Sequence, residues 1–379
     1  MTHAPALWAT PRHHLRLFSP DHPVLYVSPA ILQATAHRFL TGFPGLVTYA
    51  VKANDADMVL ENLMAAGLEA FDVASPDEMR KVRRLMPGAR LHYNNPVRAP
   101  SEIAVAVELG VQSYSVDQMA ELEKLIECGV MPGTEIAVRL KLPVAGAAYD
   151  FGAKFGASPE TARLLLARVA EEGFVPAITF HPGTQCPTVE AWVSYIHASA
   201  RVAREAGVQI ARLNVGGGFP ANRGGDAPDL EVIFEGIAAA VDDAFGDMTP
   251  ALVCEPGRAM VAEAFSLATR VKAMRDDGSV VLNDGIYGGF AEFTSMGSIQ
   301  RFDVLGAGAI PKTGALRDAV IWGPTCDSLD RLPGVLRLPE TLADGDFLIF
   351  HGMGAYSAAT ATRFNGYGAI EVITVGALH

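Results

Sequence analysis

The 379-residue sequence predicts an α/β protein built from a (β/α)8 barrel, or TIM barrel, and a C-terminal β-domain. The barrel is predicted because short β-like runs alternate with longer amphipathic stretches eight times over about 230 residues. The β-domain is predicted because the strands after about residue 263 are separated by loops and turns rather than by long helices. A doubly wound open sheet is the main alternative for the first part.

Two short apolar segments open the chain, at residues 14–18 and 24–27. We predict the first as a strand and the second as an entry segment to the barrel. A terminal strand is usually held by pairing with a sheet, so we expect this one to join the sheet of the β-domain. The predicted boundaries are residues 1–28 for the N-terminal strand, 29–262 for the barrel and 263–379 for the β-domain.

Eight apolar, β-branched runs are the predicted barrel strands, at residues 46–51, 69–73, 90–94, 111–116, 135–141, 176–181, 210–215 and 250–254. Helix-like segments lie between them, for example at residues 76–85 and 118–128. In such a barrel the chemistry gathers at the carboxyl ends of the strands. Polar or glycine residues stand at the ends of all eight runs: Lys52, Asp72, Asn94 with Asn95, Asp117, Arg139, His181, Gly216 to Gly218, and Glu255.

Several of these strand ends carry groups that catalysis could use. An ammonium at Lys52 is costly to bury unless it is paired or used as an amine, although by itself it is more simply a lysine that reaches solvent. The glycines at 216–218 can aim backbone N–H groups at a phosphate, or form an ordinary tight turn. Glu255 and Arg258 would suit a heterocyclic nitrogen and a phosphate, or a local ion pair. His181 alone would most often be a structural histidine.

Five strands are predicted in the β-domain, at residues 266–274, 280–283, 319–322, 346–350 and 370–375. Two of its loops carry chemical groups. One sets the thiol of Cys326 in a glycine–proline loop flanked by carboxylates, and the other puts the phenol of Tyr356 after two glycines. A lone cysteine in a loop is usually inert, so its neighbours decide its role.

The composition narrows the class of protein. A formal net charge of −12 disfavours nucleic acid and anionic membranes as partners. The four cysteines form no CxxC pair, which argues against a zinc site and against a secreted disulfide scaffold. The N-terminus shows no signal pattern and no apolar run is long enough to span a membrane, so we expect a cytoplasmic protein without a metal centre.

Six motifs, taken in order, resemble those of the fold type III decarboxylases that use pyridoxal 5'-phosphate (PLP). They are Tyr-Ala-Val-Lys-Ala-Asn, Phe-Asp-Val-Ala-Ser, Gly-Gly-Gly-Phe-Pro, Glu-Pro-Gly-Arg, Gly-Pro-Thr-Cys-Asp and Gly-Ala-Tyr. The pattern is most similar to ornithine decarboxylase, with lysine and diaminopimelate decarboxylases as cousins. The resemblance runs from about residue 13 to the C-terminus. It implies an alanine-racemase-like barrel with a β-domain, and a head-to-tail homodimer.

The resemblance also implies a role for each matching residue. Lys52 matches the lysine that forms the Schiff base with PLP, Asp72 matches a carboxylate near it, and Glu255 matches the partner of the pyridine nitrogen. His181 matches the imidazole that stacks on the ring. Phosphate contacts are implied for Thr184, Gly217, Gly218, Arg258 and Tyr356, and Arg139 and Gly257 are assigned to the same cofactor site.

Cys326 and Asp327 match a loop inserted from the partner subunit, so each active site would lie across the dimer interface. The thiol would be the general acid that protonates Cα after carbon dioxide leaves. The predicted catalytic residues are Lys52, His181, Glu255 and Cys326, and the predicted substrate-binding residues are Tyr287, Glu292 and Asp327.

The sequence departs from the family pattern in two places. Asn214 stands where an aspartate often precedes the glycine turn. Residues 291–297 lack the aspartate with which many ornithine decarboxylases grip the distal amine of the substrate. Glu292 is our candidate for that carboxylate, and a solvated surface glutamate is an equal alternative.

The predicted function is PLP-dependent decarboxylation of a basic L-amino acid by a homodimer. L-Ornithine is the first candidate substrate, giving putrescine for polyamine biosynthesis, followed by lysine and by diaminopimelate or another diamino acid. An alanine-racemase-like enzyme would place arginine at the pyridine nitrogen and tyrosine at the position of Cys326. A catalytically dead regulatory homologue would typically lack cofactor residues, whereas Lys52, Glu255, Arg258 and Cys326 are all present.

Overall fold

The computed structural model describes residues 7–142, 154–225 and 227–379. None of the predicted site residues lies outside these ranges, although the first six residues of the predicted N-terminal segment do. The chain forms two compact units. We call residues 36–220 and 228–260 the barrel unit. Residues up to 35, the segment 221–227 and residues 261–379 form the β unit.

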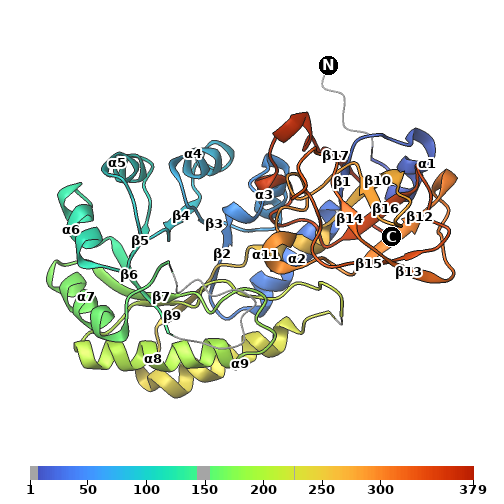
Figure 1. Ribbon diagram of the computed structural model, residues 1–379. Helices are drawn as coiled ribbons and strands as arrows, with labels where there is room; N and C mark the ends of the chain where they lie inside the picture. The colour runs from blue at the N-terminus through green and yellow to red at the C-terminus, as the bar shows by residue number, and fades with distance from the viewer. Residues whose placement is uncertain (1–6, 143–153, 226) are drawn as a thin grey trace. The chain divides into compact units, whose positions relative to one another are not determined.

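The barrel unit contains a closed barrel of eight parallel strands (Figure 1). They are β2 (Leu46–Ala50), β3 (Ala70–Asp72), β4 (Arg90–Tyr93), β5 (Ser113–Val116), β6 (Glu135–Leu140), β7 (Val175–Phe180), β8 (Arg212–Asn214) and β9 (Ala251–Cys254). Each strand pairs with the next, and β9 returns to pair with β2 through Val253 beside Leu46. This closure confirms the predicted barrel and excludes the doubly wound sheet. Each predicted strand lies within a few residues of its observed bounds.

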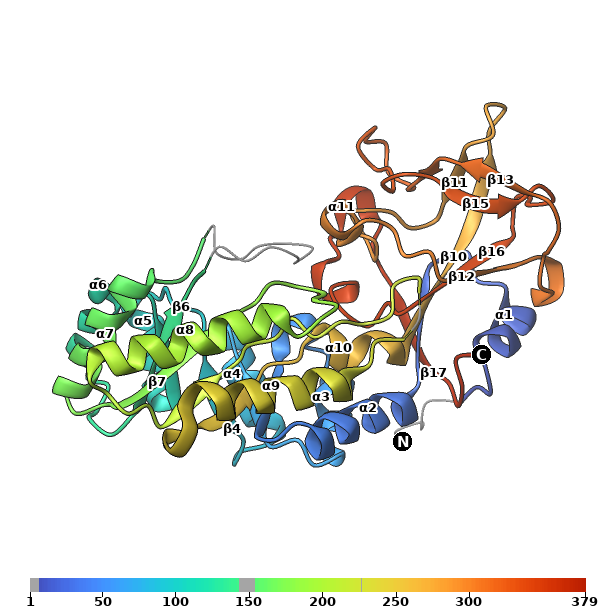
Figure 2. The same ribbon diagram turned by 90° about the horizontal axis from the view of Figure 1, so that it is seen from below.

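Helices follow the strands around the outside of the barrel, and Figure 2 shows α7, α8 and α9 side by side. The helices are α2 (Pro29–Gly42), α3 (Asp57–Ala65), α4 (Pro76–Leu85), α5 (Pro100–Glu108), α6 (Met119–Glu127), α7 (Pro159–Glu171), α8 (Glu190–Ala206) and α9 (Leu230–Phe245). The start of α4 shows why they begin where they do: the Ser75 hydroxyl accepts the Glu78 N–H at 3.3 Å, and Pro76 takes the first helical position. No helix in the described ranges is both long and apolar enough to cross a membrane.

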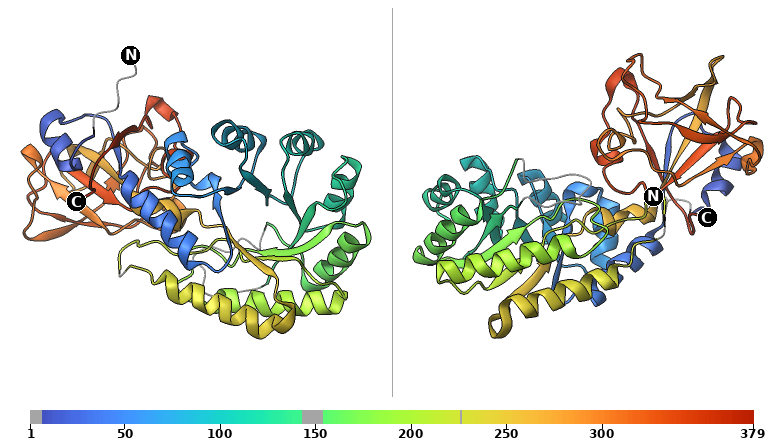
Figure 3. Two further views of the ribbon diagram at one scale, coloured as in Figure 1. Left: turned by 180° about the vertical axis from the view of Figure 1, so that it is seen from behind. Right: turned by 60° about the horizontal axis from the view of Figure 1, so that its bottom comes forward.

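The β unit is organised around one seven-stranded sheet. Its main path runs β12 (Phe302–Leu305), β16 (Phe347–His351), β10 (Phe265–Met274), β1 (Val24–Val27) and β17 (Glu371–Thr374). Strands β11 (Val280–Leu282) and β14 (Ile321–Trp322) extend it from β10, while β13 (Leu316–Ala319) and β15 (Leu336–Pro339) form a separate pair. The blue N-terminal strand β1 therefore lies within the orange and red sheet of the C-terminal half (Figure 3).

The N-terminal prediction is wrong in one respect. Residues 14–18 belong to helix α1 (Pro11–Phe18), and the strand that joins the sheet is β1, which we had predicted as an entry segment. The helix begins because the Thr10 side chain accepts the His13 N–H and Pro11 fixes the first turn. Its buried His14 then hydrogen-bonds the Tyr26 hydroxyl at 2.8 Å, which ties α1 to β1.

Two strands of the β unit were not predicted, and the single strand predicted at residues 319–322 corresponds to parts of two separate strands. Strand β12 is a half-buried edge strand, and β15 ends in Pro339 within a two-stranded sheet, so neither shows the long apolar run of a central strand. The predicted strand 319–322 divides at Val320 between β13 and β14, which belong to different sheets.

Candidate active site

The predicted cofactor residues of the barrel unit all lie at the carboxyl ends of its strands. Lys52 lies in a single 3-10 turn (Val51–Ala53) that follows β2, and Asp72 is the last residue of β3. Arg139 is the last residue but one of β6, His181 follows β7 and Glu255 follows β9. Thr184 lies in the loop after β7, Gly217 and Gly218 lie in the loop after β8, and Gly257 and Arg258 lie two and three residues after Glu255. The parallel barrel thus brings to one end residues that lie up to 206 positions apart, from Lys52 to Arg258.

Lys52 is paired with a buried carboxylate. Its Nζ lies 3.9 Å from Oδ2 of Asp72, and the lysine side chain is about half exposed (49%) while that of Asp72 is 5% exposed. Burial raises the pKa of Asp72, and the Lys52 ammonium opposes that rise. The amine is therefore open to a ligand and lies beside the carboxyl group of Asp72.

The imidazole of His181 is neutral at the same end of the barrel. Burial lowers the pKa of His181 well below its usual value, and the charges of Lys52 and Arg139 lower it further. The N–H of Gly183 donates to Nδ1 at 3.2 Å. Because Nδ1 accepts this bond, the neutral ring carries its proton on Nε2. An uncharged imidazole of this kind suits stacking on an aromatic ligand.

Glu255 is a buried carboxylate with two amide donors on one oxygen. The side-chain amides of Asn94 and Asn214 both donate to Oε1 of Glu255. Burial and then the charge of Asp72 raise the pKa of Glu255 to about 8, against the opposing charges of Lys52 and Arg139. A protonated heterocyclic nitrogen beside the carboxylate would restore its charge, so the site is suited to a cationic ring atom.

The structure explains why Asn214 can replace the expected aspartate. Its side-chain oxygen accepts the N–H of Gly216 at 2.9 Å, while its amide donates to Glu255. An ionised aspartate could accept the first bond but could not donate the second. Asn94 was noted only as a strand end, yet it contributes the other donor to Glu255 and also contacts the Asp72 carboxylate.

The turn after β8 requires its glycines. A Cβ on Gly217 would lie 2.8 Å from the Glu255 carbonyl oxygen and 3.2 Å from Nε2 of His181. Gly218 has a φ of +88°, and a Cβ there would lie 2.9 Å from Cγ of Pro182. The bare backbone thus passes directly beside two predicted cofactor residues, an approach that a side chain at either position would block.

In the β unit, two of the predicted substrate-binding residues, Tyr287 and Asp327, lie together beside the predicted proton donor Cys326. The Tyr287 hydroxyl donates to Oδ2 of Asp327 at 2.5 Å, and this bond lowers the pKa of Asp327. Cys326, the neighbour of Asp327, has an exposed side chain. Tyr356 lies in the loop after β16 with a φ of +54°.

Glu292 is not a solvated surface residue. Its side chain is 11% exposed, and its Oε1 lies 3.5 Å from Nη1 of Arg223. Arg223 also donates to the carbonyl oxygen of Gly297 at 2.5 Å, so it holds both ends of the short helix α11 (Phe293–Met296). The candidate carboxylate for a distal amine therefore already has a cation beside it.

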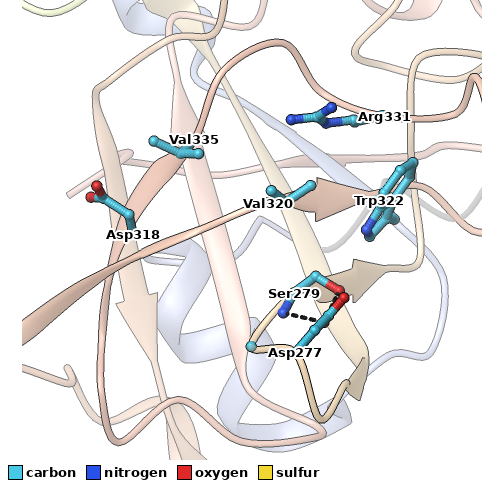
Figure 4. A pocket seen from close by; sticks show the side chains of 8 residues that line it. Asp277, Ser279, Asp318, Val320, Trp322, Arg331 and Val335 are labelled. Carbon is cyan, nitrogen blue, oxygen red and sulfur yellow. Dashed lines mark hydrogen bonds between the residues drawn. The ribbon is translucent and has the colours of Figure 1, made fainter.

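A cavity of about 230 Å³ lies elsewhere in the β unit (Figure 4). It is lined by Asp277, Gly278, Ser279, Asp318, Val320, Trp322, Arg331 and Val335, none of which is a predicted site residue. Trp322 and Arg331 directly flank the segment Gly323–Asp330, which we call the cysteine loop, and the guanidinium lies 5.6 Å from the indole ring centre. The cavity thus adjoins the two ends of the cysteine loop.

The groups of the barrel unit fit PLP. The Lys52 amine can bind its aldehyde, the Glu255 carboxylate can hold its ring nitrogen, and the backbone N–H groups of the glycine turn can bind its phosphate. A (β/α)8 barrel with these groups at its strand ends defines a PLP enzyme. The chain belongs to the pyridoxal-dependent decarboxylases: the family's model of the pyridoxal binding domain matches residues 30–262.

Known proteins similar to this chain include ornithine decarboxylase of Mus musculus, which is 32% identical over 363 residues, covering 87% of this chain and 75% of the mouse protein. Antizyme inhibitor 2 of Xenopus laevis is 32% identical over 356 residues, covering 87% of this chain and 76% of the other. Among solved structures, the arginine decarboxylase of Paramecium bursaria Chlorella virus matches with a TM-score of 0.86 at 27% identity, covering 95% of this chain and 98% of that one. The fold and the family together make this chain a PLP-dependent amino-acid decarboxylase.

Proposed function

We propose that the protein decarboxylates a basic L-amino acid, with L-ornithine as the first candidate and lysine as the second. The observation that carries this proposal is the Asp327 carboxylate, held by the Tyr287 hydroxyl and adjacent to the thiol of Cys326. A carboxylate in that position can bind a distal ammonium. The similarity to an ornithine and to an arginine decarboxylase supports a basic substrate. We further propose a cytoplasmic enzyme of polyamine biosynthesis.

The roles proposed for the barrel residues follow from their contacts. The Lys52 amine, beside Asp72, would bind the cofactor aldehyde. Glu255, fixed by its two amide donors, would hold a protonated ring nitrogen, and the neutral imidazole of His181 would contact the ring. When bound, PLP supplies the electron sink that makes loss of carbon dioxide from Cα possible.

The β unit contributes the proton donor and the substrate carboxylate. Cys326 donates its thiol proton to Cα after decarboxylation, and solvent returns a proton to the sulfur. Asp327 binds the distal ammonium. The regulatory alternative is disfavoured because a dead homologue would not need Lys52, Asp72, Glu255 and their hydrogen-bond donors gathered at one site.

A substrate screen tests the proposed activity. Purified protein with added PLP is incubated with ornithine, lysine, arginine or diaminopimelate, and carbon dioxide and the product amine are measured. We expect the highest kcat/KM on ornithine. Turnover of diaminopimelate alone would contradict ornithine and lysine as the candidate substrates, because it would require a site that also accepts a distal carboxylate, and no turnover of any of the four would favour the regulatory alternative.

We also propose that two subunits share each active site, with Cys326 and Asp327 entering the partner's barrel. Lys52→Ala and Cys326→Ala proteins, each inactive, should regain activity when mixed. Random exchange makes half of the dimers hybrids, and each hybrid has one intact site. Exchange that is proven by mass spectrometry but restores no activity would place both groups within one chain.

A further inference from the structure

Three segments of the β unit meet around the thiol of Cys326. The cysteine loop contacts the segment 284–290 through the bond from Tyr287 to Asp327. Tyr287 in turn contacts the third segment, residues 362–368: its ring centre lies 4.8 Å from that of Phe364, and its carbonyl oxygen accepts the N–H of Thr362 at 2.8 Å. The side chain at the centre of the third segment is Asn365.

Asn365 makes two hydrogen bonds to Cys326. Its Oδ1 lies 3.2 Å from the backbone nitrogen of Cys326 and 3.2 Å from the sulfur. The backbone N–H can only donate, so the atom that faces it must be the amide oxygen rather than the amide nitrogen. The thiol therefore donates its proton to the same oxygen, since a thiolate there would be repelled.

The chain holds Asn365 in a conformation that few residues adopt. Its φ and ψ are 52° and 17°, in the left-handed region that asparagine tolerates better than most side chains. Gly368 follows with a φ of +80°, and a Cβ there would lie 1.9 Å from the carbonyl oxygen of Thr362. Position 365 therefore requires a residue that tolerates a left-handed backbone, as asparagine does, and the side-chain amide of Asn365 contacts Cys326.

We propose that Asn365 is a positioning residue for the proton donor: by accepting the S–H it fixes the direction of the Cys326 thiol until the proton is needed. The catalytic part of this inference rests on the proposed function of Cys326. The physical reason is that a general acid must enter the reaction as the thiol, and an amide oxygen accepting S–H favours that form. When the proton passes to Cα, the Asn365 oxygen keeps the backbone N–H of Cys326 but loses the thiol as a donor, and the sulfur is reprotonated from solvent.

The test measures the reactivity of the thiol without any turnover. Holoenzyme is treated with iodoacetamide at neutral pH, and alkylation of Cys326 is followed by peptide mass spectrometry. Asn365→Gly removes the amide while the backbone keeps its left-handed conformation. It should be alkylated about fivefold faster or more, the scale of one lost hydrogen bond. Asn365→Asp keeps the shape but adds a negative charge that opposes the reactive thiolate, so it should be alkylated more slowly than the wild type.

Kinetics of the same variants supply the second measurement. Asn365→Gly should lower kcat by about tenfold and change KM by less than about twofold, because substrate binding does not use the amide. Equal alkylation rates in all three folded proteins would overturn the inference, whatever the activity. Altered alkylation together with full activity of Cys326→Ala would instead keep the contact and remove the proposed role of the thiol.

Discussion

One oxygen atom of the Glu255 carboxylate accepts hydrogen bonds from two side-chain amides, those of Asn94 and Asn214. Asn94→Ala removes one of its two amide donors and leaves a buried carboxylate less well satisfied. We expect the dissociation constant for PLP to rise about tenfold, since a hydrogen bond to a charged group contributes about 1.5–3 kcal/mol. Retention of PLP after dialysis, read from its absorbance, checks this. Asn95→Ala is the matched control, because within the described ranges the Asn95 side chain accepts a local hydrogen bond, from the N–H of Val97 at 3.4 Å, and does not bond Glu255. Equal PLP retention in the two variants would contradict the assignment.

The Glu292 carboxylate could pair either with the guanidinium of Arg223 or with the distal amine of a substrate. Its pairing with Arg223 leads us to expect that Glu292→Gln changes KM for ornithine by less than about threefold. Thermal unfolding should then show coupling: Glu292→Gln and Arg223→Met each lower the stability, and the double variant is hardly less stable than either one. A KM raised about tenfold for ornithine but not for a neutral amino acid of similar length would return Glu292 to the substrate site.

At the scale of an element, the cysteine loop depends on one buried carboxylate at its end. Asp330 is 1% exposed, and its side chain accepts the N–H and hydroxyl of Thr325 at 3.0 and 2.7 Å and the N–H of Ile286 at 2.9 Å. A Cβ on Gly323 would lie 2.1 Å from Oδ1 of Asp330. The loop can therefore close over Asp330 only if position 323 has no side chain.

Gly323→Ala should displace Asp330 and with it the thiol and carboxylate of the loop. Overpacking of this kind costs about 1–3 kcal/mol, and a reacting group misplaced by about 1 Å can lower the rate on the order of 100-fold. We expect kcat to fall by about tenfold or more while PLP binding is retained. Gly88→Ala is the control, since a Cβ there meets no atom within 4 Å. Wild-type kcat for Gly323→Ala would show that the loop does not need this anchor.

At the scale of the whole molecule, buried carboxyl groups make the stability of the apoprotein depend on pH. Burial is the main cause that raises the pKa of Glu255 to about 8 and the pKa values of Glu78 and Asp284 to about 7. At pH values between the ordinary pKa of each carboxyl group and its raised pKa in the folded protein, the folded protein binds more protons than the unfolded chain. The stability of the folded protein therefore falls as pH rises through this range. The buried His92, whose pKa is lowered to about 3, acts in the opposite direction, but only up to its unfolded value of about 6.5.

We therefore expect the Tm of the apoprotein to fall by several degrees between pH 6.5 and 8.5. Thermal unfolding at a series of pH values measures it. PLP should flatten the dependence, because a cationic ring nitrogen beside Glu255 stabilises the ionised carboxylate. Glu255→Gln should flatten it as well, without PLP. A Tm that rises over this interval would mean that other groups dominate.

Much of this fold could be predicted because the relevant signals are local. Each barrel strand is an apolar run with its own polar end, and all eight were found. Helix α1 was missed because its cap, Thr10 with Pro11, lies outside the apolar segment that we read as a strand. Strands β12 and β15 were missed because an edge strand needs only part of an apolar pattern.

The site was predictable only as far as single residues reveal their chemistry. Lys52, Asp72 and Glu255 stand out at strand ends, whereas the donor role of Asn94 depends on a partner 161 residues away across the closed barrel. The bonds from Cys326 to Asn365 and from Arg223 to Glu292 likewise join segments that are distant in the sequence. Contacts between distant residues produce no periodic pattern in the sequence, so they can be identified only in the folded structure.

The position of Trp322 gives the protein an optical reporter of its own. The chain has three tryptophans, and Trp192 is fully buried among the barrel helices. Trp322 stands at one end of the cysteine loop, joined by a backbone bridge to Arg331 at the other end. We expect a ligand that shifts the ends of the loop to move this indole relative to the guanidinium, so its emission should change with that movement. Stopped-flow fluorescence could therefore time that movement in the unlabelled enzyme and separate it from the release of carbon dioxide.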